Sequence, residues 1–356
     1  MRRFTSAPMC DAFLTLAQLE EGVTCFLVPR WLPNGTRNSN FRVVRLKDKM
    51  GDRSNASSEV EYEKAWARRI GPKGRGVQTI VDMVVHTRLD CGTGSTALMR
   101  QLFQMTLNHA LHRKVFGTTL IDAPVMRALL ADLAVESEAA MWMSLFTSSL
   151  FDRCSQSDVD EYANPMRRLV TAIQKYWICK KAPGFAYECM EGVGGNGYVH
   201  EWDFPRFFQQ SPLNSIWEGS GNTIVLDILR TLVKEPKSFE SLSNELQKTM
   251  GQSKIYDSAF KSVFKELSDL QKLMKDNPND TQLHGRFAVD CLAQLLEACL
   301  LRQHAPGYVA DWYDMTRLQG NAGLRRNYGS LPVSLPSRDI GRILDREISA
   351  FQQGTH

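Results

Sequence analysis

The 356-residue chain has the composition of a folded globular protein, with 43% hydrophobic and 23% charged residues and a formal net charge of +4. These values exclude disordered and fibrous classes, and the length favours one large domain with one or two smaller ones. No apolar run is long enough to span a bilayer, and the opening MRRFTSAPMC lacks the apolar stretch of a secretory signal. We therefore expect a soluble protein of the cytoplasm, with the mitochondrion as an alternative location, and no membrane partner.

The eight cysteines are scattered along the chain without a C-x-x-C pair. This spacing indicates neither a zinc site nor a disulfide framework. We expect free thiols and no bound metal.

The N-terminal part of the chain has the pattern of a small antiparallel β unit. Short runs rich in β-branched and aromatic residues, AFLTLAQ, TCFLVPR and FRVVRL, alternate with turn-forming stretches such as EEG and PNGTRNSN. Residues 1–68 are therefore interpreted as a partial β domain.

From residue 77 the hydrophobic pattern becomes helical. A long helix reaching His112 is predicted by apolar residues at the spacing of one buried face, which are Val77, Ile80, Val81, Val84 and Val85. Further helices are predicted at about 122 to 150, 158 to 190 and 222 to 233, with loops at 155–157 and between Gly192 and Gly219. Residues 69–235 are expected to form a helix bundle.

Residues 236–356 are expected to form a helical extension that packs on the bundle. Two amphipathic runs lie on either side of Asn277-Pro278, and their apolar faces comprise Phe260, Val263, Phe264, Leu267 and Leu270, then Ala288, Cys291, Leu292, Leu295, Leu296 and Cys299. Beyond Pro306 the pattern weakens. The expected fold class is thus α+β and mostly α.

A glycine-rich segment follows the third predicted helix. Residues 192–197 match the string G-x-G-x-x-G, which brings backbone N–H groups close to a pyrophosphate when it joins a strand to a helix. Here it follows a helix instead, so a nicotinamide site is not indicated. Two interpretations remain, a helix end or a contact with a phosphate or adenine group.

A second segment, NSIWEGSGN, places a carboxylate next to apolar residues just ahead of a predicted helix. Ile216 and Trp217 would partly desolvate Glu218, and desolvation makes a carboxylate a stronger base at neutral pH. Ser220 and Asn222 follow at a helix start, where N–H groups and side-chain donors can hold the polar edge of a cofactor. The alternative is a helix-capping segment with a surface glutamate.

A third segment, His112 to Gly117, ends the long predicted helix with clustered cations. Such cations interact favourably with the negative end of the helix dipole, so capping is a sufficient structural explanation. An arginine fork such as that of Arg113 would also suit a pyrophosphate.

Taken in order, R-K-x-F-G, G-G-x-G-Y and W-E-G-S-G-N, separated by helical stretches, closely resemble the C-terminal domain of the acyl-CoA dehydrogenase family. The segments FLVPR, RLKDKMGDRSNASSEVEYE, HTRLDC and NSIWEGSGN, with the additional C-terminal helices, look most like the AidB-like branch of that family. The resemblance covers nearly the whole chain.

The resemblance implies an FAD-dependent oxidoreductase. In this family a carboxylate removes the α-proton of a fatty acyl-CoA while the β-hydrogen leaves as hydride to the flavin. Glu218 matches that base in the family's tyrosine-glutamate-glycine motif, with Trp217 in place of the tyrosine, and the bulkier indole would narrow the acyl pocket. One subgroup takes its base from the position before an arginine of the long helix, but here Thr87 precedes Arg88, which leaves Glu218 as the candidate. Arg88 matches the family arginine that steers the thioester or orients the base.

The resemblance also implies how FAD would be held. Arg113 and Phe116 match residues that contact the pyrophosphate and adenine end of a cofactor bound mainly by a neighbouring subunit. Gly194, Gly195 and Gly197 match a backbone contact to the same dinucleotide. Ser220 and Asn222 match contacts on the side of the base. Phe4 and Ser6 match strand residues at the flavin ring. Glu191 stands where many relatives have glutamine, which removes an amide donor.

Because the family's cofactor site straddles subunits, we expect a homodimer or homotetramer. Family members begin with a helical domain and a complete β domain, whereas this chain is expected to start midway through the β domain. An N-terminally truncated gene product, a fragment, or a partner of a separate N-terminal chain would fit.

A basic stretch near the C-terminus supports an alternative function. Its six arginines are Arg317, Arg325, Arg326, Arg338, Arg342 and Arg346. An AidB-like flavoprotein with little or no dehydrogenase activity would use such a patch to bind double-stranded DNA. A helical scaffold that oligomerises without catalysis is a third possibility.

Overall fold

The computed structural model describes residues 2–4, 6–156, 160–319, 327–331 and 334–354. Its contacts divide the chain into two compact units, Met1–Thr87 and Arg88–His356, and the division falls within the first helix, α1 (Gly76–His112). The described chain is mostly helical with small antiparallel sheets, which confirms the predicted fold class. The expected three-part division at residues 68/69 and 235/236 stays a prediction.

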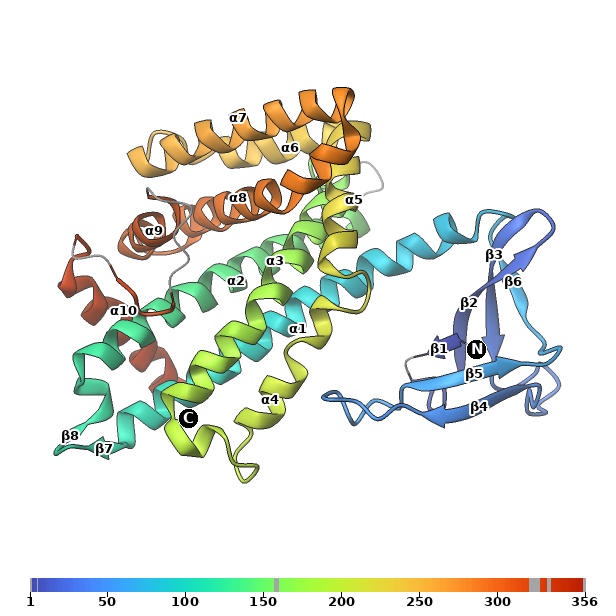
Figure 1. Ribbon diagram of the computed structural model, residues 1–356, viewed down its shortest axis with the longest axis horizontal. Coiled ribbons are helices and arrows are strands. Elements are labelled where there is room, and N and C mark those ends of the chain that lie inside the picture. The colour runs from blue at the N-terminus through green and yellow to red at the C-terminus, as the bar shows by residue number, and fades with distance from the viewer. Residues whose placement is uncertain (1, 5, 157–159, 320–326, 332–333, 355–356) are drawn as a thin grey trace. The chain divides into compact units, whose positions relative to one another are not determined.

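The first unit contains two three-stranded antiparallel sheets (Figure 1), one ordered β1-β5-β4 and the other β2-β3-β6. Strands β2, β3 and β4 confirm the three strands predicted from the pattern, and β1 contains Phe4, which the resemblance assigns to a strand, whereas β5 and β6 were not expected. The six strands are β1 (Arg2–Phe4), β2 (Ala12–Leu19), β3 (Gly22–Pro29), β4 (Phe41–Leu46), β5 (Ser58–Tyr62) and β6 (Arg68–Ile70).

A small core lies within this unit, formed by Ala7, Val28, Phe41 and Val60. The start of α1 also belongs to the unit, and its predicted buried face is only partly correct. Val85 is buried, but Val77 is 53% exposed, so the prediction is wrong at Val77.

The second unit is a bundle of helices, and the long predicted helices are confirmed by α1, α2, α3 and α5. Two predictions are corrected. The predicted loop between Gly192 and Gly219 contains a helix, α4, and Ser155 and Gln156 of the predicted loop at 155–157 belong to α2. The helices are α2 (Pro124–Gln156), α3 (Ala163–Gly192), α4 (Phe204–Gln210), α5 (Gly221–Lys234), α6 (Pro236–Gln247), α7 (Lys254–Asp276), α8 (Pro278–His304), α9 (Gly307–Tyr313) and α10 (Ser337–Gln353).

Shorter elements join these helices. A two-stranded hairpin, β7 (Lys114–Val115) and β8 (Thr118–Thr119), follows α1. Single turns of 3-10 helix follow the hairpin, α3 and α4, and a π-helical turn follows α9. These turns are η1 (Leu120–Asp122), η2 (Gly194–Gly197), η3 (Leu213–Ser215) and η4 (Asp314–Leu318).

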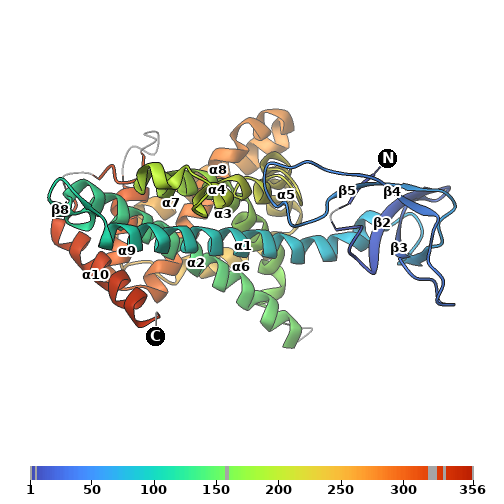
Figure 2. The same ribbon diagram turned by 90° about the horizontal axis from the view of Figure 1, so that it is seen from below.

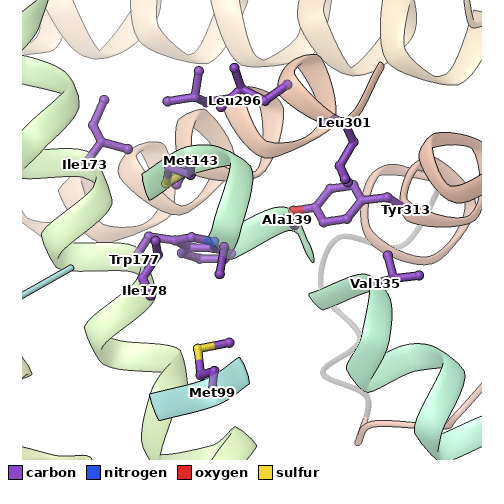
Figure 3. Packing of buried hydrophobic residues seen from close by; sticks show 14 of the residues in the cluster. Met99, Val135, Ala139, Met143, Ile173, Trp177, Ile178, Leu296, Leu301 and Tyr313 are labelled. Carbon is purple, nitrogen blue, oxygen red and sulfur yellow. The ribbon is translucent and has the colours of Figure 1, made fainter. Parts of the chain in front are cut away.

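One hydrophobic core extends through the second unit and includes residues of helices on both sides of residue 235. In Figure 1, α8 lies on α2 and α3, α6 contacts α3, and α7 packs on α8, while Figure 2 shows α1 on the opposite side of α2 and α3. Figure 3 shows side chains from several of the helices meeting in the centre, among them Met99, Met143, Trp177, Leu296 and Tyr313. The C-terminal helices thus complete the core of the bundle.

Among the described residues, no helix is both long and apolar enough to cross a membrane. The same residues contain no group of three or more histidine, cysteine or acidic side chains arranged to hold a metal ion. All eight cysteines are free thiols.

Candidate active site

Glu218 lies on a tight turn that leads into α5. Its φ of +58° is in the left-handed region, and Gly219 follows with φ of +104°. A left-handed conformation is costly for a residue with a Cβ atom and persists only when its surroundings enforce it. Ser220 then returns to extended backbone as the residue preceding α5. The strained backbone at Glu218 marks the turn as a candidate functional site.

Two cations from different helices hold this turn by its main-chain carbonyls. Arg88 of α1 donates from Nε to the carbonyl oxygen of Glu218 at 3.2 Å, and Lys175 of α3 donates to the carbonyl oxygen of Gly219. Gly219 suits this turn, because its φ of +104° strains a residue with a Cβ atom, and an added Cβ atom would also lie 3.1 Å from Ile224 Cδ1. The predicted proximity of Arg88 and Glu218 is therefore observed, although Arg88 contacts the backbone of Glu218 rather than its carboxylate.

Arg88 is itself fixed by Asp227 of α5. Its Nη1 atom lies 2.7 Å from Asp227 Oδ2, and Arg168 of α3 donates to Asp227 Oδ1 at 2.9 Å. Burial alone would raise the pKa of Asp227, but its two arginine partners outweigh that effect and lower the pKa. The ionised Asp227 thus orients Arg88 toward the Glu218 turn.

Trp217 is held on the other side of Glu218. Its indole Nε1 donates to Asn214 Oδ1 at 2.9 Å, and Asn214 Nδ2 donates to Ser95 Oγ at 3.0 Å and to the carbonyl of Cys91 at 3.3 Å. This chain of bonds fixes the indole against α1. The predicted large residue beside Glu218 is therefore immobilised, and only part of its surface is exposed.

The carboxylate of Glu218 is half-buried. No residue of the described chain donates a hydrogen bond to it or lies in an ion pair with it, although its backbone is firmly held. A carboxylate that is positioned but not engaged is free to accept a proton.

The glycine-rich segment forms η2 at the end of α3. Gly194 has φ of +68°, and Cβ atoms added at Gly194 or Gly195 would meet no atom within 4 Å, so these two residues present open backbone. Gly197 is different, because an added Cβ atom would lie 2.0 Å from the carbonyl oxygen of Met190. Gly197 is therefore required for packing against the helix end, whereas Gly194 and Gly195 leave room for a ligand.

Arg113 and Phe116 lie at the end of α1 and in the hairpin after it. Both are exposed, and Phe116 is 105% exposed relative to its reference state. Phe116 and Gly117 form the two-residue connection of the hairpin with φ of +49° and +84°. A bulky aromatic residue is unusual in this conformation, which turns Phe116 into solvent.

The hairpin end of α1 and the glycine end of α3 lie together. Thr106 Oγ1 of α1 donates to the carbonyl of Cys189 at 3.2 Å, and the rings of His109 and Trp202 meet edge to face at 6.5 Å between centroids. The cationic and glycine-rich segments that the sequence singles out are therefore at the same end of the bundle.

Four predicted site residues remain, two that follow the Glu218 turn and two in the first unit. Ser220 is exposed at the start of α5, and exposed Asn222 accepts a hydrogen bond from Arg286 Nε at 2.9 Å through its side-chain oxygen. Ser6 has φ of +59° and donates to Asn55 Oδ1 within the first unit. Phe4 belongs to β1 of the same unit, and its side chain is outside the described part of the structure. The assignment of these four residues to a cofactor site stays a prediction.

The predicted basic patch is largely engaged within the protein. Arg317 is paired with Asp132 and Glu136, and Arg346 with Glu138, all three carboxylates being buried on α2. Arg342 lies 3.1 Å from Asp339 and over the ring of Tyr308, while Arg338 is 3.9 Å from Asp339. Arg325 and Arg326 lie outside the described residues. DNA binding by this region is not tested by these contacts.

The sequence and fold have clear relatives. Residues 74–233 match the family model described as "Acyl-CoA dehydrogenase, C-terminal domain". The chain is 40% identical over 294 residues to AidB of Escherichia coli, which is named as an acyl-CoA dehydrogenase, covering 83% of this chain and 53% of that protein. It is 27% identical over 322 residues to acyl-CoA dehydrogenase family member 11 of Caenorhabditis elegans, covering 86% and 52%. The chain thus spans about half the length of the curated relatives it matches.

Solved structures show the same fold. Caenorhabditis elegans ACDH-11 in complex with C11-CoA superposes with a TM-score of 0.77 at 25% identity, over 98% of this chain and 62% of that one. An acyl-CoA dehydrogenase from Bacillus anthracis complexed with FAD gives 0.77 at 15% identity, over 98% and 69%. Together with this shared fold, the sequence matches show that the chain belongs to the acyl-CoA dehydrogenase family.

Proposed function

We propose that this chain forms the base-carrying part of an FAD-dependent dehydrogenase that acts on an acyl thioester. The observation that carries the proposal is the Glu218 turn. The main-chain carbonyls of Glu218 and Gly219 are bonded to Arg88 and Lys175, while the Glu218 carboxylate remains free. Glu218 would remove the proton next to the thioester carbonyl. The neighbouring residues support this assignment, because Thr87 offers no alternative base before Arg88.

The open backbone of η2 fits the contact that a dinucleotide needs. Gly194 and Gly195 leave space where side chains would otherwise stand, and Arg113 offers a guanidinium that none of the described residues engages in an ion pair. Gly194, Gly195, Arg113 and Phe116 would hold the pyrophosphate and adenine end of FAD. When bound, FAD supplies the acceptor for the hydride that leaves the β-carbon.

The substrate class follows from the relatives and from Trp217. One structural relative is described in complex with C11-CoA, and we extend the acyl-CoA class to this chain. The fixed indole of Trp217 would form one wall of the acyl pocket beside Glu218. We expect this wall to favour slender acyl groups over groups branched close to the thioester, because the hydrogen bond to Asn214 restrains the indole.

The site would be shared between two copies of the chain. Arg88 beside Glu218 and the end of α1 beside Arg113 are separated by roughly 36 Å of continuous helix at 1.5 Å per residue. A single dinucleotide does not reach both regions. Each copy would therefore give Glu218 to one site and Arg113 to another, as in a homodimer or homotetramer.

A spectroscopic experiment tests the proposal. The purified chain is expected to take up added FAD, and an acyl-CoA panel is expected to bleach the flavin absorbance. Glu218→Gln should keep FAD but reduce the rate of bleaching by about 100-fold or more, because an amide does not accept the proton. Glu240→Gln, at an exposed position on α6, serves as the matched control and should bleach at the native rate.

Absence of FAD uptake by the wild-type chain would contradict the proposal. So would a Glu218→Gln variant that bleaches as fast as the wild type. If Glu218→Gln lost bound FAD to the same extent as it lost bleaching, Glu218 would support the fold of the cofactor site rather than the proton transfer.

A further inference from the structure

Lys175 is a buried cation without a carboxylate partner. It lies in the middle of α3 and is 1% exposed. None of the ion pairs among the described residues involves Lys175, and its ammonium group donates to the main-chain carbonyl of Gly219. A buried charge that lacks an opposite charge is costly, so its presence indicates a role that a neutral side chain does not fill.

Arg88 makes a matching contact with the same turn. Arg88 bonds the carbonyl of Glu218, and Lys175 bonds the next carbonyl, that of Gly219. Because Glu218 and Gly219 both have positive φ, their peptide groups are turned away from ordinary helical or strand geometry. A buried carbonyl needs a donor, and each of these two receives one from a charged side chain.

Lys175 lies among groups that act on its pKa in opposite directions. Burial lowers the pKa of Lys175, and Arg88 acts in the same direction, while Cys179, Cys91 and Glu218 oppose them. Burial raises the pKa of the Cys91 thiol to about 12 and that of Cys179 to about 11, so both thiols are neutral at physiological pH. Neither thiol therefore supplies the buried ammonium group with a paired anion.

We propose that Lys175 is a positioning residue that, together with Arg88, fixes the strained turn and so presents the Glu218 carboxylate. The effect on proton transfer rests on the proposed function, whereas the hold on the turn does not. Lys175 would touch neither substrate nor cofactor. It would act by keeping Glu218 and Gly219 in the conformation that leaves the carboxylate unengaged.

The test compares Lys175→Met with Lys180→Met in the full chain. Methionine retains the apolar stem of lysine and removes the charge and the donor. Lys180 is a matched control, because it is a lysine of the same helix that lies near the start of α5. A Cβ atom added at Gly221 would be 3.1 Å from its Nζ atom, yet no bond from Lys180 to the turn is present among the described residues. Two readouts are measured, amide hydrogen exchange of residues 217–223 and flavin bleaching by acyl-CoA.

In Lys175→Met, exchange at residues 217–223 should be about tenfold faster or more, with α8 unchanged. The kcat for bleaching should fall roughly 10- to 100-fold, because a small displacement of a reacting group has effects of this size. KM and FAD content should stay within about twofold of the wild type, since ligand contacts are not removed. Lys180→Met should match the wild type in both readouts.

Unchanged exchange at residues 217–223 in Lys175→Met would overturn the proposal, as would faster exchange throughout the bundle including α8. If Lys175→Met does not fold, Lys175→Gln takes its place, because its amide keeps a neutral donor, and the same two exchange outcomes decide. If the wild-type chain takes up no FAD, the proposed function fails, but the exchange experiment still decides whether Lys175 holds the turn.

Discussion

Glu297 of α8 is a buried carboxyl group in an asymmetric environment. Its Oε2 atom accepts hydrogen bonds from Trp177 Nε1 at 2.8 Å and from the Tyr313 hydroxyl at 2.5 Å, while no described group donates to Oε1. Burial raises the pKa of Glu297 to about 7, Lys181 opposes this rise, and the nearby Glu136 adds to it. Glu297 is therefore protonated in the folded protein over a range of pH in which the unfolded chain is ionised.

The free energy of unfolding should depend on this proton. Between about 4.3, the ordinary glutamate pKa, and about 7, the folded state binds the proton more tightly, so the contribution of Glu297 to stability falls as pH rises. Glu297→Gln removes this titration and keeps the acceptor for Trp177 and Tyr313. At pH 8 the variant should be about 1–3 kcal/mol more stable than the wild type, and below pH 4.5 this advantage should vanish.

Urea unfolding at a series of pH values measures the difference between the two proteins. Glu240→Gln, which changes an exposed glutamate of α6, should give a profile parallel to that of the wild type. A parallel profile for Glu297→Gln would contradict the prediction.

At this scale the sequence predicts residue types better than their partners. Glu218 is predicted because it lies between Trp217 and a glycine ahead of a helix, and Arg88 by resemblance. Lys175 is missed because a lysine within a helix has the same local pattern whether it is exposed or buried. Its carbonyl partner is 44 residues away, and only the packing of α3 against the Glu218 turn brings them together.

The β7–β8 hairpin presents its aromatic residue to solvent in a strained conformation. A Phe116→Asn variant should keep the hairpin, because asparagine tolerates positive φ more readily than phenylalanine. The stability of the bundle should change by less than about 0.5 kcal/mol, since the ring is exposed. FAD affinity should nevertheless fall about tenfold or more, because a stacking surface is lost.

FAD titration by fluorescence quenching and thermal unfolding check this prediction. Val125→Asn is a suitable control, because Val125 is 83% exposed at the start of α2, outside the hairpin. Unchanged FAD affinity in Phe116→Asn would remove Phe116 from the cofactor site. A large loss of stability would indicate that the ring packs on the protein in solution.

Elements with a strong hydrophobic period are predicted well, and those stabilised by polar contacts are not. Strand β5 has the polar sequence SEVEY, yet Glu59 within it is buried, because Arg45 and Lys47 pair with its carboxylate. Helix α4 is only 7 residues long and follows a glycine-rich stretch, so its sequence was interpreted as loop. Ion pairs between neighbouring strands produce no hydrophobic periodicity in the sequence. A helix of two turns is too short to show one.

The distribution of charge over the surface was also not predicted correctly from the sequence. Arg317 and Arg346 count as part of a basic stretch along the chain, but their partners Asp132, Glu136 and Glu138 are 181 to 208 residues away on α2. These buried pairs join the C-terminal helices to the centre of the bundle. Among the described arginines of the stretch, Arg338 and Arg342 remain the more exposed, which leaves a smaller surface for phosphate contacts than the sequence suggests.

The length of α1 between Arg88, which bonds the Glu218 turn, and Arg113 leads to a prediction for the assembled protein. If each site takes Glu218 from one copy and Arg113 from another, Glu218→Gln and Arg113→Ala destroy both sites of their own homodimers. A mixed dimer would contain one site with both substitutions and one site with neither. After co-refolding of equal amounts, about a quarter of all sites should be intact by random pairing, so bleaching of flavin by acyl-CoA should return to about that fraction of the native value.

The control is a mixture of the two folded variants prepared without unfolding, so that their subunits do not exchange. Its bleaching activity should equal the sum of the activities of the two separate variants. A second control co-refolds Glu218→Gln with the double variant Glu218→Gln/Arg113→Ala, which creates no intact site in any pairing. Recovery in the first mixture alone would locate Glu218 and Arg113 on different copies of one site. Failure to recover, with FAD-binding wild-type protein in hand, would mean that each chain completes its own site. The roughly 36 Å of α1 between Arg88, which bonds the Glu218 turn, and the helix end next to Arg113 would then exclude Glu218 or Arg113 from the cofactor.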